Sequence, residues 1–236
     1  MAEKQLLLTA VNIIAAPREA LETLRLKPTV MLPLVAIIIV NIAVVFTYYS
    51  QVDLTWTLES SLQNASEDMT PREREAASRA IENLSPMVVG SIAAVSGSLF
   101  LTLWLFLNAA YLAGVSLLTD DGIKLKHWFA MICWCALPIV FGYAASLANL
   151  FLSDATFLRP DRINPLSFSS LLDLDSAADS GMRQSVQSLD ITTIWSMVLG
   201  VYAYQLWTQR NPFKSALIVL APAILIFGSI WYFTSS

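Results

Sequence analysis

The sequence has little charge for its length. Charged residues make up 14% of the 236 positions, against about 25% in a typical soluble domain. No charged residue falls between positions 30 and 49 or between 87 and 118. The net charge of −4 excludes a general basic surface for nucleic acid. Together with a hydrophobic content of 56%, the deficit indicates a protein whose surface largely faces lipid rather than water.

Residues that bind metals or carry out catalysis are also scarce. The two cysteines, Cys133 and Cys135, are two positions apart in an apolar stretch, so on a helix they point to nearly opposite sides. The single histidine, His127, has only Asp120 and Asp121 as nearby acidic residues, whereas a zinc site needs at least two or three strong ligands. We predict no catalytic residue, no metal site and no cofactor. A membrane enzyme built on His127 and the two aspartates is the weakest alternative.

Long apolar segments are what the sequence has in abundance. A bilayer core about 30 Å thick needs roughly 20 apolar helical residues. Five segments of the sequence meet or approach this length. The fourth, residues 191–207, is the weakest candidate for a span, because it contains Tyr202, Tyr204 and Gln205. We therefore predict an all-α integral membrane protein in which residues 1–236 form one domain, a five-transmembrane-helix bundle. The predicted spans are residues 30–49, 87–118, 128–152, 191–207 and 216–233.

The segment before the first span predicts amphipathic helices at the membrane surface, over residues 5–27. Gln5, Thr9 and Asn12 form one polar stripe on an otherwise apolar helix. A signal peptide has no need of such a stripe, so we reject that interpretation. Pro17 is suited to the first position of a second short helix. The apolar side of that helix consists of Ala20, Leu21 and Leu24.

Charge asymmetry predicts the orientation of the bundle. The N-terminal segment and the loops after the second and fourth spans carry eight cations and five anions. The loops 50–86 and 153–190 carry six cations and 13 anions. Cytoplasmic loops are enriched in Lys and Arg. We therefore expect a cytoplasmic N-terminus, an extracytoplasmic C-terminus and two extracytoplasmic loops.

The first outer loop contains helix signals. Thr70 to Glu73 forms a capping box with proline at the first helical position, and helical character continues to Leu84. Residues 54–62 are a second helical candidate. Two interpretations stay open: a hairpin packed on the bundle, and a docking surface for a partner. In the second loop, the aspartates between 173 and 179 do not match a calcium-binding loop, and we expect a solvated connection.

Inside the predicted spans we find packing residues and no buried ionisable group, whereas ion-coupled transporters usually place ionisable groups there. Asparagine and glutamine side chains predict interhelical hydrogen bonds, and small residues four positions apart predict close helix approach, within the bundle or between copies. Two prolines predict kinks in the third and fifth spans. The candidate packing or partner-contact residues are Asn41, Gly90, Gly97, Asn108, Gly114, Pro138, Gly142, Asn149, Tyr202, Gln205 and Pro222.

Several blocks of the chain resemble the Yip1-domain family of membrane proteins in a short prokaryotic form. The resemblance covers nearly all of the chain except residues 50–86. It rests on residues 16–24 with 27–28, residues 128–129 with 133–138, residues 194–200, and residues 214–218 with 221–222. It implies five spans, a bacterial inner membrane as the location and no defined catalytic set. Eukaryotic members are linked to Rab GTPases and membrane shaping through a long N-terminal region, whereas about 28 residues precede the first span here. Some prokaryotic members are similar to accessory partners of ABC exporters.

Two functional hypotheses follow. The first is a non-enzymatic scaffold or accessory subunit that contacts the lipid bilayer and binds another membrane protein, such as ABC exporter subunits, or a second copy of itself. The second is a transporter or channel for a small or lipid-like solute, with Tyr202, Tyr204 and Gln205 lining a cavity.

Overall fold

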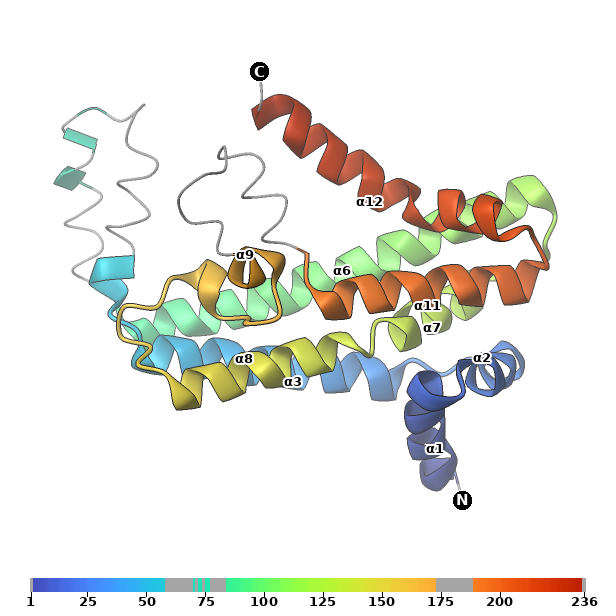
Figure 1. The fold of residues 1–236 in the computed structure, drawn as a ribbon, viewed down its shortest axis with the longest axis horizontal. Helices are drawn as coiled ribbons and strands as arrows, with labels where there is room; N and C mark the ends of the chain where they lie inside the picture. Colours follow the sequence, from blue (N-terminus) through green and yellow to red (C-terminus); the bar gives the residue numbers. More distant parts are fainter. Residues whose placement is uncertain are drawn as a thin grey trace.

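The computed structural model of the chain describes residues 2–57, 70, 72, 73, 75, 76, 84–172 and 189–234. Every regular element among these residues is helical (Figure 1), and the described strand-like pairing is a single bridge between Ser167 and Asp190. The elements are α1 (Ala2–Ala15), α2 (Pro17–Leu26), α3 (Met31–Gln51), α6 (Pro86–Thr119), α7 (Leu125–Cys135), α8 (Ile139–Leu152), η1 (Pro160–Arg162), α9 (Phe168–Leu171), α11 (Ile191–Thr208) and α12 (Pro212–Thr234).

Three of the described helices are long and apolar enough to cross a membrane: α3, α6, and α7 with α8 taken together. The described part of α12, Pro212–Ile226, is a shorter apolar helix. Helix α11 has 18 residues, but its threonines, tyrosines and glutamine lower its hydropathy. The all-α membrane class is therefore confirmed, whereas length and composition do not establish the expected count of five spans.

The third apolar segment is broken rather than gently kinked. Helix α7 ends at Cys135, α8 begins at Ile139, and residues 136–138 form turns between them. Proline at position 138 has no amide hydrogen to give to the carbonyl of Trp134. The amide of Leu137 donates to that carbonyl instead, at 3.2 Å. The helix therefore tightens and restarts at the position where the sequence predicted a kink.

Close helix approach depends on glycine at two places. A Cβ atom added to Gly90 of α6 would lie 3.0 Å from the Cβ of Tyr49 in α3. A Cβ atom added to Gly142 of α8 would lie 2.9 Å from Thr192 Oγ1 in α11. Along the α3–α6 contact, Asn41 Nδ2 donates to Ser98 Oγ at 3.2 Å. These contacts support the predicted role of small and amide residues in helix packing.

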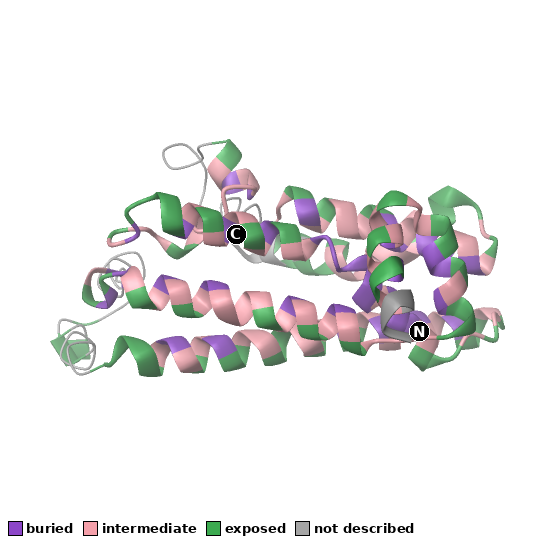
Figure 2. Ribbon diagram, turned by 90° about the horizontal axis from the view of Figure 1, so that it is seen from below, coloured by how far each residue is buried: buried purple, intermediate pink, exposed green. Residues whose placement is uncertain are grey.

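The largest buried cluster lies where α2, α7 and α11 meet. The Trp128 ring packs on Tyr204 with centroids 5.4 Å apart and on Trp207 at 5.6 Å. The indole of Trp207 donates to the carbonyl of Leu21 in α2 at 3.1 Å. Elsewhere the helices are buried over only part of their circumference (Figure 2). Two smaller buried clusters lie along α3, around Ile37 and around Tyr48. Apolar, exposed helix faces along the length of the bundle are expected when lipid covers those faces.

The N-terminal helices form as predicted, but α1 differs from expectation in which face is covered. The predicted apolar side of α2 is buried. Helix α1 runs across the long axis of the bundle (Figure 1). Thr9, from its expected polar stripe, is buried, whereas Leu7, Leu8 and Val11 are 58%, 52% and 61% exposed. Thr9 therefore faces protein, and Leu7, Leu8 and Val11 form an exposed apolar face of α1.

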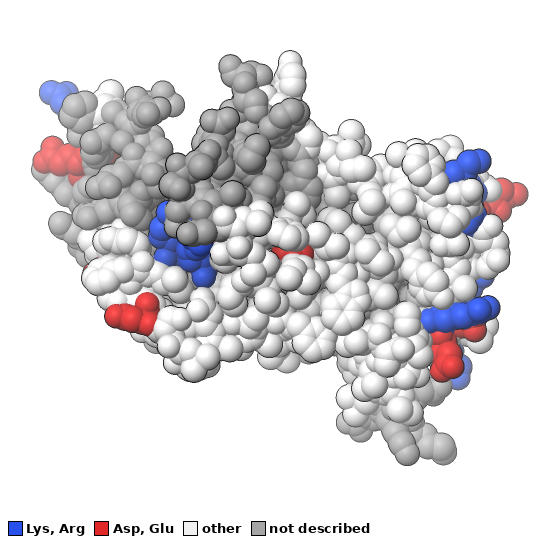
Figure 3. Space-filling view, viewed as in Figure 1, with Lys and Arg blue, Asp and Glu red and all other residues white. Residues whose placement is uncertain are grey.

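Helix α2, the α6–α7 turn and the α11–α12 turn lie at the same end of the bundle (Figure 1). Charged side chains lie at both ends, with Lys or Arg near Asp or Glu at each (Figure 3). At the end opposite α2, the chain after α3 meets the chain after α8: Asp53 N donates to Thr156 O at 2.8 Å. Tyr48 reinforces this junction, since its hydroxyl donates to Leu158 O at 2.9 Å.

The predictions for the loops 50–86 and 153–190 can be compared with the structure in part. The capping box forms: Thr70 N and Oγ1 both donate to Glu73 Oε2 at 2.8 Å, and Glu73 N donates to Thr70 Oγ1 at 3.4 Å. Residues 54–57 are helical. The remainder of the two helices expected in this loop, and the aspartates between 173 and 179, lie outside the described residues.

Candidate functional site

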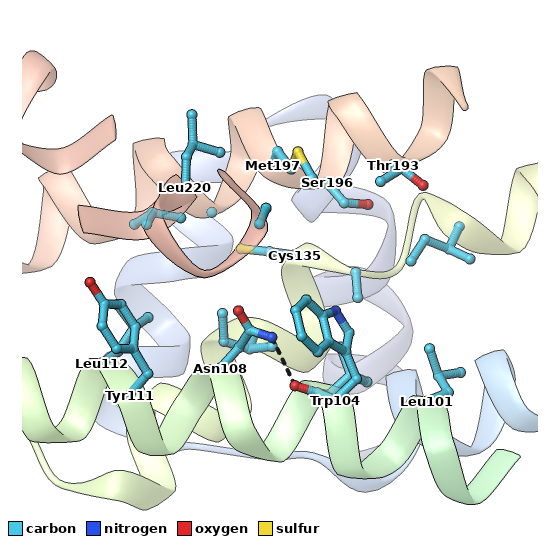
Figure 4. Close-up of a pocket in the computed structure, with 17 residues that line it drawn as sticks. Leu101, Trp104, Asn108, Tyr111, Leu112, Cys135, Thr193, Ser196, Met197 and Leu220 are labelled. Carbon is cyan, nitrogen blue, oxygen red and sulfur yellow. Dashed lines mark hydrogen bonds between the residues drawn. The ribbon is translucent and has the colours of Figure 1, made fainter. Parts of the chain in front are cut away.

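An apolar groove is enclosed by α6, α11 and α12, with the break between α7 and α8 as its floor. Its cavity is about 130 Å³. In Figure 4, Trp104, Asn108 and Tyr111 project from α6 toward α11, and Cys135 lies behind them. The opposite wall comes from α11 and α12. The main lining residues are Leu101, Trp104, Asn108, Tyr111, Ile132, Cys135, Ile139, Thr193, Ser196, Met197, Gly200, Val219, Leu220 and Ala223.

Two polar side chains of the groove, those of Asn108 and Ser196, are engaged within their own helices. Asn108 Nδ2 donates to Trp104 O at 2.8 Å, and its side-chain oxygen faces the cavity (Figure 4). Asn108 therefore does not form the interhelical bond that the sequence predicted. Ser196 Oγ donates to Thr192 O at 2.9 Å. No charged side chain is among the described residues that line the groove, so this site favours an apolar occupant.

The inner end of the groove approaches a polar cluster. Thr119 Oγ1 donates to Asp121 Oδ2 at 2.6 Å, and Arg210 Nη2 donates to Asp121 Oδ1 at 3.0 Å. The hydrogen bond that Arg210 donates to Asp121 raises the pKa of Arg210 above its ordinary value. Arg210 Nε and the Tyr204 hydroxyl are buried and, within the described part of the chain, have no hydrogen-bond partner. Two hydrogen-bond donors are thus unused at the basic end of the bundle.

The expected cavity around Tyr202, Tyr204 and Gln205 is divided. Tyr202 and Gln205 line a shallow groove of about 430 Å³ between α11 and α12, on the outer side of α11. Tyr204 lies in the core, fully buried against Trp128. The three side chains therefore do not line one cavity, because successive positions on α11 point in different directions.

A second small-residue surface faces outward. A Cβ atom added to Gly114 of α6 would meet nothing within 4 Å. Gly114 and Ala110 border a hollow of about 540 Å³ between the last turns of α6 and the start of α7, which also includes Leu117, Lys124 and Leu125. We call this hollow the Gly114 notch. Unlike Gly90, Gly114 makes no close contact inside the described bundle.

The outer end of the bundle holds a polar cavity that the sequence analysis missed. Asp190 Oδ1 accepts hydrogen bonds from Thr193 N at 2.6 Å and Thr192 Oγ1 at 2.8 Å. Its Oδ2 accepts from Asn164 Nδ2 at 2.6 Å. Asn149 Nδ2 reaches the carbonyls of Arg162 and Ile163 at 3.2 and 3.1 Å. The cavity here is about 200 Å³. Aspartate directly before an apolar run is an N-cap signal that could have identified Asp190.

The predicted packing residues thus fall into separate places rather than one site. Pro138 is at the break beneath the groove, and Pro222 lies inside α12, whose second half diverges from α11 (Figure 1). Gly97 is close to Asn41, with 3.8 Å between an added Cβ and the amide nitrogen. No group of three metal-ligating side chains occurs among the described residues.

Comparison with known proteins gives one match. The family model described as Yip1 domain matches residues 11–233. No curated protein and no solved structure matches the chain significantly.

Proposed function

The chain belongs to the Yip1-domain family of membrane proteins, and we propose that it acts as a non-enzymatic scaffold or accessory subunit that docks a transmembrane helix of another membrane protein. The Gly114 notch is the observation that carries this proposal. A helix of the partner, such as an ABC exporter subunit, or α6 of a second copy would fill the notch.

The proposal includes a five-span topology. Helices α11 and α12 would span with α3, α6 and the α7–α8 pair, which gives an odd number of crossings. This count agrees with the placement of α2 and the α6–α7 and α11–α12 turns at one end. By the positive-inside rule, that cation-rich end is cytoplasmic. Helix α1 would lie in the cytoplasmic interface with Leu7, Leu8 and Val11 in lipid.

Gly114 differs from Gly90 and Gly142 in having no neighbouring helix, and this difference supports docking at the notch. Gly90 and Gly142 are used inside the bundle, because an added Cβ at either position meets a neighbouring helix at about 3 Å. Gly114 has the same sequence pattern and no such neighbour. Small residues let helix backbones approach closely in lipid, where packing and hydrogen bonds replace the hydrophobic driving force. An open small-residue surface on a membrane helix therefore favours a helix as its occupant.

Gly114→Leu tests the proposal, with Gly228→Leu as the matched control. An added Cβ at Gly228 also meets nothing within 4 Å, but that residue lies on α12, away from the notch. We expect Gly114→Leu to abolish recovery of the partner or second copy from native nanodiscs, and Gly228→Leu to leave it intact. Wild-type protein that is recovered only as a monomer without a partner, or equal recovery for both variants, would reject helix docking at this surface.

A second candidate function, movement of a lipid-like solute, is favoured by the apolar groove beside a broken helix. Non-helical backbone at membrane depth is tolerated where it is buried in protein or lines a cavity, and residues 136–138 meet this condition. Reconstituted protein would be assayed for transfer of fluorescent lipid between leaflets. A rate equal to that of protein-free vesicles would exclude transport while leaving the docking proposal untouched.

A further inference from the structure

We propose that the groove binds a membrane phospholipid, with one acyl chain between α6 and α11 and the phosphate at Arg210. The groove and the Gly114 notch share no lining residue, and Asn108 and Gly114, six residues apart, point in directions about 120° apart around α6. Phospholipid binding therefore requires neither helix docking nor transport.

The shape and chemistry of the groove suit an acyl chain. It follows α11 from Thr193 to Gly200, a rise of about 10 Å. Leucine, isoleucine, methionine and tryptophan side chains form most of its walls, and it holds no charge among its described lining residues. Helices α6 and α12, which form two of its walls, also carry exposed apolar side chains, such as those of Phe100, Leu103 and Leu225. A chain from the surrounding bilayer can therefore enter sideways without crossing water.

Two donors that suit a phosphate lie beyond the inner end of the groove, which Tyr111 and Gly200 line. Tyr204 is one helical turn beyond Gly200, and Arg210 follows the end of the same helix. Arg210 uses one terminal nitrogen on Asp121 and keeps its buried Nε unpaired. Its side chain is 27% exposed, so a headgroup can reach it. A buried donor without a partner is costly, and a phosphate oxygen would satisfy Arg210 Nε and offer an acceptor to the Tyr204 hydroxyl.

Charge distinguishes this occupant from other apolar molecules. The end of the bundle that holds Arg210 also carries Lys124, Lys126 and Lys214, so it attracts an anionic headgroup. A transmembrane helix would fill the groove but would leave both donors unpaired. A diacylglycerol would fill it without supplying an anion. The combination of an apolar channel and free donors at its basic end therefore points to a phospholipid.

The test uses the full chain in nanodiscs with a phosphatidylglycerol that carries a photoreactive group in one acyl chain. We expect cross-links on the groove faces of α6 and α11. Competition by unlabelled phosphatidylglycerol should be strong, whereas dioleoylglycerol, which lacks the phosphate, and glycerol phosphate, which lacks the chains, should compete poorly. Arg210→Gln should weaken labelling about tenfold, the factor expected for one lost charge-assisted hydrogen bond.

Four variants keep the test decisive. Arg18→Gln removes a cation of α2 whose side chain is 71% exposed and should leave labelling unchanged. Asp121→Asn breaks the ion pair with Arg210 but keeps the Arg210 guanidinium. Labelling should therefore persist even if the ion pair contributes to the stability of the protein. Ala223→Phe should block the groove. Val95→Phe should not, because Val95 is 61% exposed on the lipid face of α6. Labelling spread evenly over the exposed face of α6, equal competition by diacylglycerol, or no effect of Arg210→Gln and Ala223→Phe would overturn the proposal.

Discussion

Asn164 donates a hydrogen bond of 2.6 Å from Nδ2 to Asp190 Oδ2, and this contact fastens the loop after α8 to the first turn of α11. The same aspartate caps α11 through Thr193 N. Asp190→Ala should therefore destabilise the bundle by about 1–2 kcal/mol, the usual cost of a lost N-cap. The free energy of unfolding in a detergent titration measures this. Asp154→Ala removes an exposed loop carboxylate and should cost much less.

Gly142→Ala and Gly228→Ala should change stability in opposite directions. At position 142 a methyl group would lie 2.9 Å from Thr192 Oγ1 and 3.0 Å from Asp190 Oδ2. Overpacking of this kind costs about 1–3 kcal/mol, which exceeds the gain of up to about 1 kcal/mol from better helix propensity. At position 228 the methyl group meets nothing within 4 Å, so only the gain remains. Unfolding free energies of the two variants would refute this if they moved together.

The hydrogen bond from Asn41 to Ser98 should show a small but measurable coupling. It joins α3 and α6 at 3.2 Å. Interhelical hydrogen bonds in membrane proteins average about 0.6 kcal/mol in double-mutant cycles, with a maximum of about 1.7 kcal/mol. A cycle with Asn41→Leu and Ser98→Ala, read by unfolding free energy, tests this. A coupling of zero would show that the contact contributes packing alone.

Trp207→Phe should loosen α2 from the bundle. The substitution keeps most of the aromatic contact with Trp128 but removes the donor to Leu21 O. The loss of one hydrogen bond costs about 0.5–1.5 kcal/mol. We expect faster trypsin cleavage after Arg25. Trp195→Phe, whose ring stacks on Phe141, should leave that cleavage rate unchanged, and equal rates for all three proteins would contradict the role given to Trp207.

Glu73 should titrate at lower pH than an ordinary glutamate. Its pKa is lowered by hydrogen bonds from the backbone amide and the hydroxyl of Thr70. The capping box is therefore formed above this lowered pKa and is lost as the pH falls through it. Carboxyl-carbon NMR of labelled protein measures the pKa of Glu73. Thr70→Val removes the hydroxyl donor and should move the pKa part of the way back toward its ordinary value; an unchanged pKa would exclude that hydrogen bond.

The sequence by itself determined where the described helices lie. The predicted first two spans, residues 30–49 and 87–118, agree with α3 and α6 to within two residues at each end. The Thr70 capping box and the interruption at Pro138 also follow from local signals. Local signals suffice for such features because a helix in lipid must satisfy its backbone hydrogen bonds within its own segment.

Only the tertiary structure decided what each packing residue contacts. Gly90, Gly142 and Gly114 share one sequence pattern, yet the first two meet a neighbouring helix and the third faces open space. Asn41 bonds across helices, whereas Asn108 bonds to its own helix and faces the groove. The physical reason is that helical periodicity fixes which residues share a face, while the helix that covers that face is chosen by contacts between segments far apart in the sequence.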